Sequence, residues 1–203
     1  MEFRLTYSGV LLGASRNDTR ARHKHEIRRY FHPQLRRFWQ VHPALLHAKA
    51  TGVQWLHKDW DAIPSMSEDR ATRFHSGSYN FVPLVLKQDM ALCYLNILFL
   101  RADAPGSVIK SGDIDNRLKT LFDALRMPTD VNELGGYDAP TDDEKPFYVL
   151  LEDDNLITRI SVETDGMLEA PGSGRRHDND ARLIITVNLK PYAETFGNPH
   201  SLK

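Results

Sequence analysis

Apolar and polar positions alternate in two different periods along the chain, and each period predicts a different element. Alternation over residues 2–9 predicts a first strand. Apolar residues recur every three or four positions within residues 20–50, which predicts a helix there. The apolar stripe of this helix is Ile27, Phe31, Leu35 and Phe38. Pro33 and Pro43 predict a kink or a break, because proline donates no backbone hydrogen bond.

The remaining pattern predicts a central sheet and a second helix. Residues 61–80 are rich in Ser, Asp, Gly and Asn, so we expect a loop. An amphipathic helix is predicted over residues 114–126. Strands are predicted within 81–102, as one or two strands, and at 157–164 and 182–189, the last two joined by a long hairpin connection. This order predicts an α/β fold with a small mixed β-sheet packed with helices.

Composition places these elements in one domain spanning residues 1–203. The longest apolar stretch, residues 90–100, is too short to span a bilayer, so no transmembrane helix is expected. The single cysteine, Cys93, lies inside that apolar stretch and has no partner for an internal disulfide. A buried free thiol fits a reducing compartment, and we therefore expect a cytoplasmic protein.

The formal net charge of −1 conceals a strong asymmetry. Residues 1–60 contain eleven Lys or Arg and four Asp or Glu, a net charge of +7. Residues 113–169 contain five basic and fifteen acidic residues, a net charge of −10. A basic surface attracts phosphate groups, and an acidic pocket holds metal ions. The chain is thus predicted to have a basic N-terminal helical region (20–60) and an acidic insertion (128–150).

The second helix opens with the sequence Asp-Ile-Asp-Asn, residues 113–116. Asp113 can cap the helix, Asp115 favours the helix dipole, and Lys119 lies one turn after Asp115. These local roles alone explain the motif. A second acidic cluster, Glu152 with Asp153 and Asp154, stands directly before a predicted strand.

Two carboxylate clusters change the interpretation, because like charges held together raise each other's pKa values. A bound Mg²⁺ removes that cost, since it is a hard cation that binds a few carboxylates and keeps several waters. Such a site suits phosphodiester hydrolysis, in which the metal activates water and stabilises phosphate charge. Lys119 is placed to stabilise the same charge.

The quoted motifs resemble the RusA-like Holliday-junction resolvases. The shared features are D-x-D-N, a lysine four residues after the second Asp, an F-D-A-L helix and a D-D pair before a strand. The resemblance covers residues 90–190 and implies a homodimer that makes paired, Mg²⁺-dependent nicks in four-way DNA junctions, with Mn²⁺ able to substitute. It implies metal binding by Asp113, Asp115 and Asp154, with Asp153 as the less important neighbour, a catalytic role for Lys119 and contact of Asn116 with DNA.

The acidic insertion departs from the family pattern, because residues 128–150 bring six carboxylates close to the expected DNA. These residues are Asp130, Glu133, Asp138, Asp142, Asp143 and Glu144. We expect no firm structure in this insertion. It can point away, pair with the basic helix, or cover the empty site, and pairing or covering is favoured. Flap or fork substrates stay open, as do a non-cleaving RusA-like DNA-binding or regulatory module and a DxD-type nucleotide-sugar transferase.

The N-terminal helix carries a basic stripe that is predicted to contact DNA phosphates. Its residues are Lys24, Arg28, Arg29, Arg36 and Arg37. A solvated helix face is the alternative. Six histidines between residues 23 and 57 match no zinc motif, and most of them are expected to be exposed.

Overall fold

The computed structural model describes residues 1–14, 20–50, 59–101, 114–168 and 179–193. Its helices are α1 (Ala21–Val41), α2 (Pro43–Leu46), α3 (Met66–Arg73) and α4 (Ile114–Leu125). Its strands are β1 (Glu2–Val10), β2 (His75–Ser76), β3 (Tyr79–Val85), β4 (Ala91–Arg101), β5 (Phe147–Leu151), β6 (Ile157–Gly166) and β7 (Asp180–Pro191). Short 3-10 helices in the described ranges are η2 (Lys87–Asp89), η3 (Val131–Leu134), η4 (Asp142–Glu144) and η5 (Asp154–Leu156).

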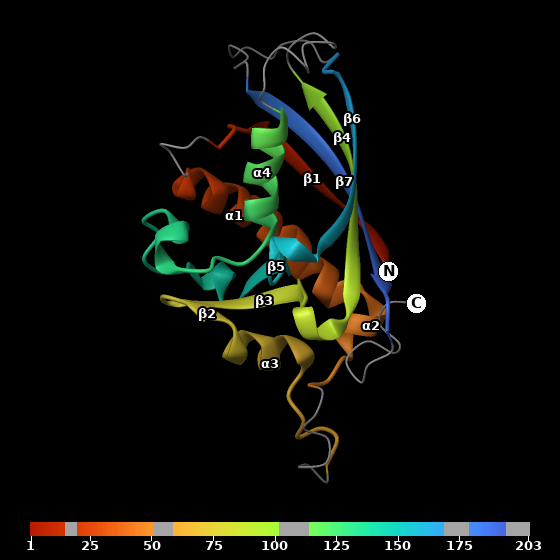
Figure 1. Ribbon diagram of the computed structural model, residues 1–203. Coiled ribbons are helices and arrows are strands. Elements are labelled where there is room, and N and C mark those ends of the chain that lie inside the picture. The colour runs from red at the N-terminus through yellow and green to blue at the C-terminus, as the bar shows by residue number, and fades with distance from the viewer. Residues whose placement is uncertain (15–19, 51–58, 102–113, 169–178, 194–203) are drawn as a thin grey trace.

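The structure has the predicted α/β class, but two mixed sheets form its scaffold in place of the single sheet expected. The larger sheet has the order β1-β7-β4-β6, in which β4 and β6 are parallel and the other pairs are antiparallel. The smaller sheet has the order β2-β3-β5, with β3 parallel to β5. Helices α1 and α4 lie side by side against one face of the larger sheet (Figure 1).

Alternating side chains from the strands and one stripe from each helix fill the main core. Ile27, Phe31 and Leu35 of α1 are each almost fully buried there, as their spacing predicts. Helix α1 continues through Pro33 as one element, so the predicted break at this proline is wrong. Burial of Phe31 and Leu35 on either side of it offsets the lost backbone hydrogen bond. Pro43 instead begins α2, as expected from its fixed φ.

Three local expectations are corrected. Residues 61–80 contain α3, because Ser65 and Glu68 form a reciprocal capping box rather than a loop. The predicted hairpin between β6 and β7 is wrong, since these strands flank β4 on opposite sides. The acidic insertion has structure after all, in η3, η4 and β5.

The acidic insertion is held by a second, smaller core. Leu134 of η3 is buried with four residues of the smaller sheet: Tyr79, Phe81, Phe147 and Val149. Two histidines of α1 are also buried, His25 completely and His32 almost so, which corrects their expected exposure. Burial, together with the nearby Arg28 guanidinium, lowers the pKa of His25 to about 3. His25 is therefore a neutral packing residue at physiological pH.

Candidate functional site

Helix α4 presents one charged stripe, because residues four apart in sequence lie on the same helix face. Asp115, Lys119 and Asp123 follow one another along this stripe. Asp115 and Lys119 are exposed, whereas Asp123 is buried at the C-terminal end. The opposite face buries Leu121 and Leu125 in the main core, as predicted. Asp113, the expected helix cap and metal ligand, lies outside the described residues.

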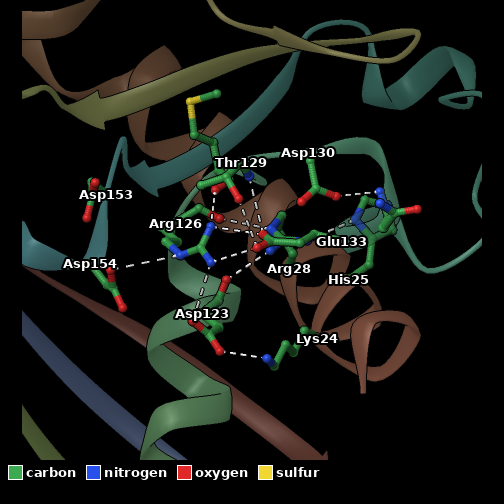
Figure 2. A network of polar contacts seen from close by, with 12 residues as sticks. Lys24, His25, Arg28, Asp123, Arg126, Thr129, Asp130, Glu133, Asp153 and Asp154 are labelled. Carbon is green, nitrogen blue, oxygen red and sulfur yellow. Dashed lines mark hydrogen bonds and ion pairs between the residues drawn. The ribbon is translucent and has the colours of Figure 1, made fainter. Parts of the chain in front are cut away.

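A network of ion pairs surrounds Asp123 (Figure 2). Lys24 of α1 places its Nζ 2.6 Å from Asp123 Oδ2. Arg126 places Nη2 3.5 Å from Asp123 Oδ1 and donates two hydrogen bonds of 2.9 Å to the Glu133 carboxylate. Burial alone would raise the pKa of Glu133, but these bonds to Arg126 outweigh it and hold that pKa below its usual range. A cavity of about 280 Å³ lies beside the network, lined by Lys24, Asp123, Arg126 and Glu133 among others.

Arg28 of α1 is buried next to this network and bonds the backbone of two of its residues. Its side chain is 1% exposed, and its guanidinium donates to the backbone carbonyls of Asp123 (2.8 Å) and Arg126 (2.9 Å). These carbonyls lie in the last turn of α4 and directly after it, where helical hydrogen-bond partners are missing. Burial lowers the pKa of Arg28 to about 10, so it stays charged at neutral pH. Arg28 therefore caps α4, and its predicted contact with DNA phosphate is incompatible with this burial.

The second acidic cluster stands where β5 ends and η5 begins. Asp154 Oδ1 lies 4.0 Å from Arg126 Nε, and the Asp154 side chain is 43% exposed. Burial raises the pKa of Asp154, and the neighbouring Asp153 raises it further. Asp153 has the opposite shift: Lys87, 2.7 Å away, and the Asn155 backbone N–H lower its pKa. Within this pair, the negative charge of Asp153 is stabilised by Lys87, whereas the negative charge of Asp154 is poorly compensated.

The described residues bring Asp154 to the C-terminal end of α4 and leave Asp115 at its first turn. Asp123 follows Asp115 by eight positions, which corresponds to about 12 Å along a helix axis. Among the described residues, no three His, Cys, Asp or Glu side chains are grouped closely enough to hold a metal ion. The donor chemistry nevertheless fits Mg²⁺, since these are carboxylate oxygens and a cation would relieve the raised pKa of Asp154.

The basic stripe of α1 is largely paired with acidic groups. Arg29 forms an ion pair with Glu144, and Arg36 Nη1 lies 3.7 Å from Asp143 Oδ1. His32 also bonds the Asp143 carbonyl through Nε2 at 2.9 Å. Of the three arrangements considered for the acidic insertion, pairing with the basic helix is therefore the one observed. Arg37 is exposed.

Asn116, the remaining predicted DNA contact, is half-buried at the start of α4. Its backbone carbonyl accepts hydrogen bonds from the Ala14 N–H at 3.2 Å and from the Thr120 hydroxyl at 3.2 Å. Sequence reasoning missed the roles of Asp123, Arg126 and Arg28 in this region. One signal was present for Arg28: it precedes Leu35 by seven residues, or two helical turns, and so shares its buried face.

The exposed ion pair of Arg36 with Asp143 allows a test of whether the acidic insertion masks the positive charge of α1. Asp143→Asn removes the carboxylate beside Arg36 while leaving the backbone carbonyl that binds His32. We expect DNA affinity to rise by about two- to threefold at low salt, because exposed ion pairs are weak and screened. Fluorescence anisotropy over a salt series measures this. Asp69→Asn, on α3, is the matched control, and equal affinity for both variants would contradict masking by Asp143.

Comparison of the chain with models of protein families, with curated protein sequences and with solved structures finds no match in any of the three. Within the described residues, no helix has the length and apolar character needed to cross a membrane.

Proposed function

We propose that this protein is an Mg²⁺-dependent, structure-selective endodeoxyribonuclease that acts on branched DNA, four-way junctions above all. The observation that carries the proposal is the charged stripe of α4. Asp115 and Lys119 are exposed one turn apart, and Asp154, with its raised pKa, stands at the other end beside Arg126. Acidic residues beside an exposed lysine suit a phosphodiester substrate better than an apolar one.

The proposal assigns metal binding to Asp113, Asp115 and Asp154, with Asp153 next to it. Because Asp154 lies at the opposite end of α4 from Asp115, one Mg²⁺ held by both carboxylates would require η5 and the first turn of α4 to approach each other. A bound Mg²⁺ supplies a water of lowered pKa and stabilises negative charge on the phosphate. Lys119 is proposed to stabilise developing charge on the same phosphate. Asp153 contributes mainly by holding η5, since its carboxylate accepts from the Asn155 N–H and pairs with Lys87.

Approach of DNA is proposed to involve the exposed cations of α1. Arg37 is exposed on α1, and Arg36 Nη1 donates to the Asp143 carbonyl at 3.2 Å and lies 3.7 Å from the exposed Asp143 carboxylate. Lys24 and Arg29 already have close acidic partners, so their contribution requires those partners to be displaced. The basic surface offered to phosphates is therefore smaller than the charge of residues 1–60 suggests.

The direct test is cleavage of labelled four-way junctions, flaps, forks and linear duplexes with Mg²⁺, Mn²⁺ or EDTA. The proposal expects metal-dependent nicks on one or more branched substrates and little cutting of the duplex. Products should carry defined ends at the branch, which sequencing gels resolve. Absence of cutting on every branched DNA with both metals would exclude the nuclease assignment.

A non-cleaving DNA-binding module is a second candidate, favoured by one observation. Asp153 and Asp154 each have an intramolecular cation nearby, Lys87 and Arg126. A protein that supplies its own cations has less need of Mg²⁺. Binding of junction DNA that is unaffected by EDTA, with no cleavage, would support this module over the enzyme.

Lys119→Ala separates catalysis from binding. If Lys119 stabilises transition-state charge, single-turnover cleavage should fall roughly a hundredfold while DNA affinity changes little. Lys190→Ala, at the end of β7, is the matched control because it also removes an exposed lysine. An unchanged cleavage rate would leave Lys119 as a surface residue of α4.

A further inference from the structure

β6 is an edge strand of the larger sheet. In the order β1-β7-β4-β6, its neighbour among the described strands is β4 on one side, and no described strand pairs with its other side. The strand runs for ten residues, Ile157–Gly166, with most side chains exposed. An edge of this length offers a row of backbone donors and acceptors to another strand.

The sequence of β6 has a two-fold pattern centred on Ser161. Residues 158–164 read Thr-Arg-Ile-Ser-Val-Glu-Thr. If two copies pair antiparallel with Ser161 facing its own equivalent, Arg159 lies opposite the partner subunit's Glu163. In the same register, Ile160 lies opposite the partner subunit's Val162, and Thr158 opposite the partner subunit's Thr164. Each of these cross-strand combinations is favourable.

The faces of β6 agree with this pairing. Arg159 is in register with Tyr94 and Glu163 with Leu98, so both charged residues lie on the sheet face away from the buried side chains of β4. The Arg159 guanidinium lies 5.9 Å from the centre of the Tyr94 ring. Ile160 and Val162 are in register with the buried Leu95 and Ile97, on the core face.

The open edge of the sheet leaves the apolar side chain of Ile160 exposed. This side chain remains 47% exposed although its register partner Leu95 is fully buried. A second β6 strand would cover Ile160 with the partner subunit's Val162 and extend the core across the junction. Burial of apolar area then adds to the backbone hydrogen bonds.

Neighbouring registers match less well. Shifting the centre to Ile160 sets Arg159 against the partner subunit's Ser161 and Glu163 against the partner subunit's Ile157. Shifting it to Val162 sets Ile160 against the partner subunit's Thr164 and Glu163 against the partner subunit's Ser161. Charged side chains on an edge strand usually prevent pairing with another strand. Here Arg159 and Glu163 oppose each other's equivalents when two copies pair in the register centred on Ser161, and they do not in the two neighbouring registers.

The opposite edge of the sheet offers a contrast. β1 allows a matched pairing only over a shorter stretch. An antiparallel pairing centred on Phe3 would set Glu2 against the partner subunit's Arg4, but it would span only residues 1–5, whereas the register about Ser161 spans residues 158–164. The two edges of one sheet therefore differ in their capacity for symmetric pairing.

We propose that two copies of this chain associate through antiparallel pairing of their β6 strands about Ser161, joining the two four-stranded sheets into one continuous sheet. Arg159 and Glu163 set the register, and Ile160 with Val162 provides the apolar contact. The proposal does not depend on the nuclease assignment, because it concerns association without DNA or metal.

Charge reversal tests the register. Sedimentation velocity over a roughly hundredfold range of protein concentration should show a monomer–dimer equilibrium. Arg159→Glu or Glu163→Arg alone creates two like-charge pairs, and each should weaken the dimer at least about tenfold. The double variant Arg159→Glu, Glu163→Arg restores both pairs and should return the dissociation constant to within about threefold of the original. A chain that stays monomeric, or a dimer indifferent to both reversals, would overturn the proposal.

Cross-linking tests the position of the two-fold axis. Cβ atoms directly opposite in an antiparallel pair lie about 4.5–5.5 Å apart, close to disulfide reach. Ser161→Cys should therefore form a covalent dimer with oxidised glutathione, whereas Ser8→Cys on the exposed β1 edge should not. Cys93 does not compete, because burial raises the pKa of its thiol to about 12. Equal cross-linking of the two variants would refute pairing through β6.

Discussion

Asp154→Asn is expected to reduce Mg²⁺-dependent cleavage of branched DNA by about a thousandfold or more while leaving the fold intact. The amide keeps the shape of the carboxylate but removes the negative charge that binds a metal ion and supports transition-state stabilisation. The loss should appear in single-turnover rates at saturating enzyme. Asp113→Asn and Asp115→Asn are expected to have losses of the same order.

The raised pKa of Asp154 makes this variant informative. Asp153 and burial both disfavour the charged form of Asp154, so Asn at this position removes a repulsion. Thermal stability should therefore be equal to or slightly above that of the original chain, and loss of activity cannot come from unfolding.

Two further variants control this experiment. Asp153→Asn should lower activity less than Asp154→Asn, and it should lower stability, because it breaks the pair with Lys87 and weakens the cap of η5. Asp69→Asn, on α3, should cut normally. Full activity of Asp154→Asn would remove this residue from the catalytic site, and equal losses at Asp153 and Asp154 would contradict their different roles.

Arg28→Met is expected to lower the free energy of unfolding by about 3–4 kcal/mol. Methionine fills part of the volume, but it leaves two C-terminal carbonyls of α4 without their buried donor and the network around Asp123 without support. Removing one partner of a buried charged contact typically has a cost of this size. Urea denaturation followed by circular dichroism measures the change.

Arg22→Met is the matched control, because Arg22 lies on the same helix with a side chain 74% exposed and pairs only weakly with Glu26. Its effect should stay within about 0.5 kcal/mol. If Arg28→Met is as mild as Arg22→Met, then Arg28 does not cap α4 in solution, and its assignment to the DNA-binding stripe becomes acceptable again.

Helix α4 and the strands β1, β4, β6 and β7 could be predicted from the sequence, because their apolar periods reflect burial of one face against one core. The same period places Asp115, Lys119 and Asp123 on one side of α4, but it does not show that Asp123 is buried while the other two are exposed. Helix α3 was missed because Ser, Asp and Glu near residue 65 were interpreted by composition, whereas Ser65 and Glu68 act together as a cap.

Contacts between residues far apart in sequence determine which charged side chains pair, and the apolar period of the sequence does not predict them. The sequence by itself determined that α1 is basic and that residues 128–150 are acidic. Only the tertiary structure decided that Arg29 meets Glu144, that Lys24 and Arg126 share Asp123, and that Arg28 is enclosed. Coulomb attraction between charges is non-directional and reaches many partners. Packing of α1 between α4 and β5 therefore selects the pairs, because it fixes which side chains approach within a few ångströms.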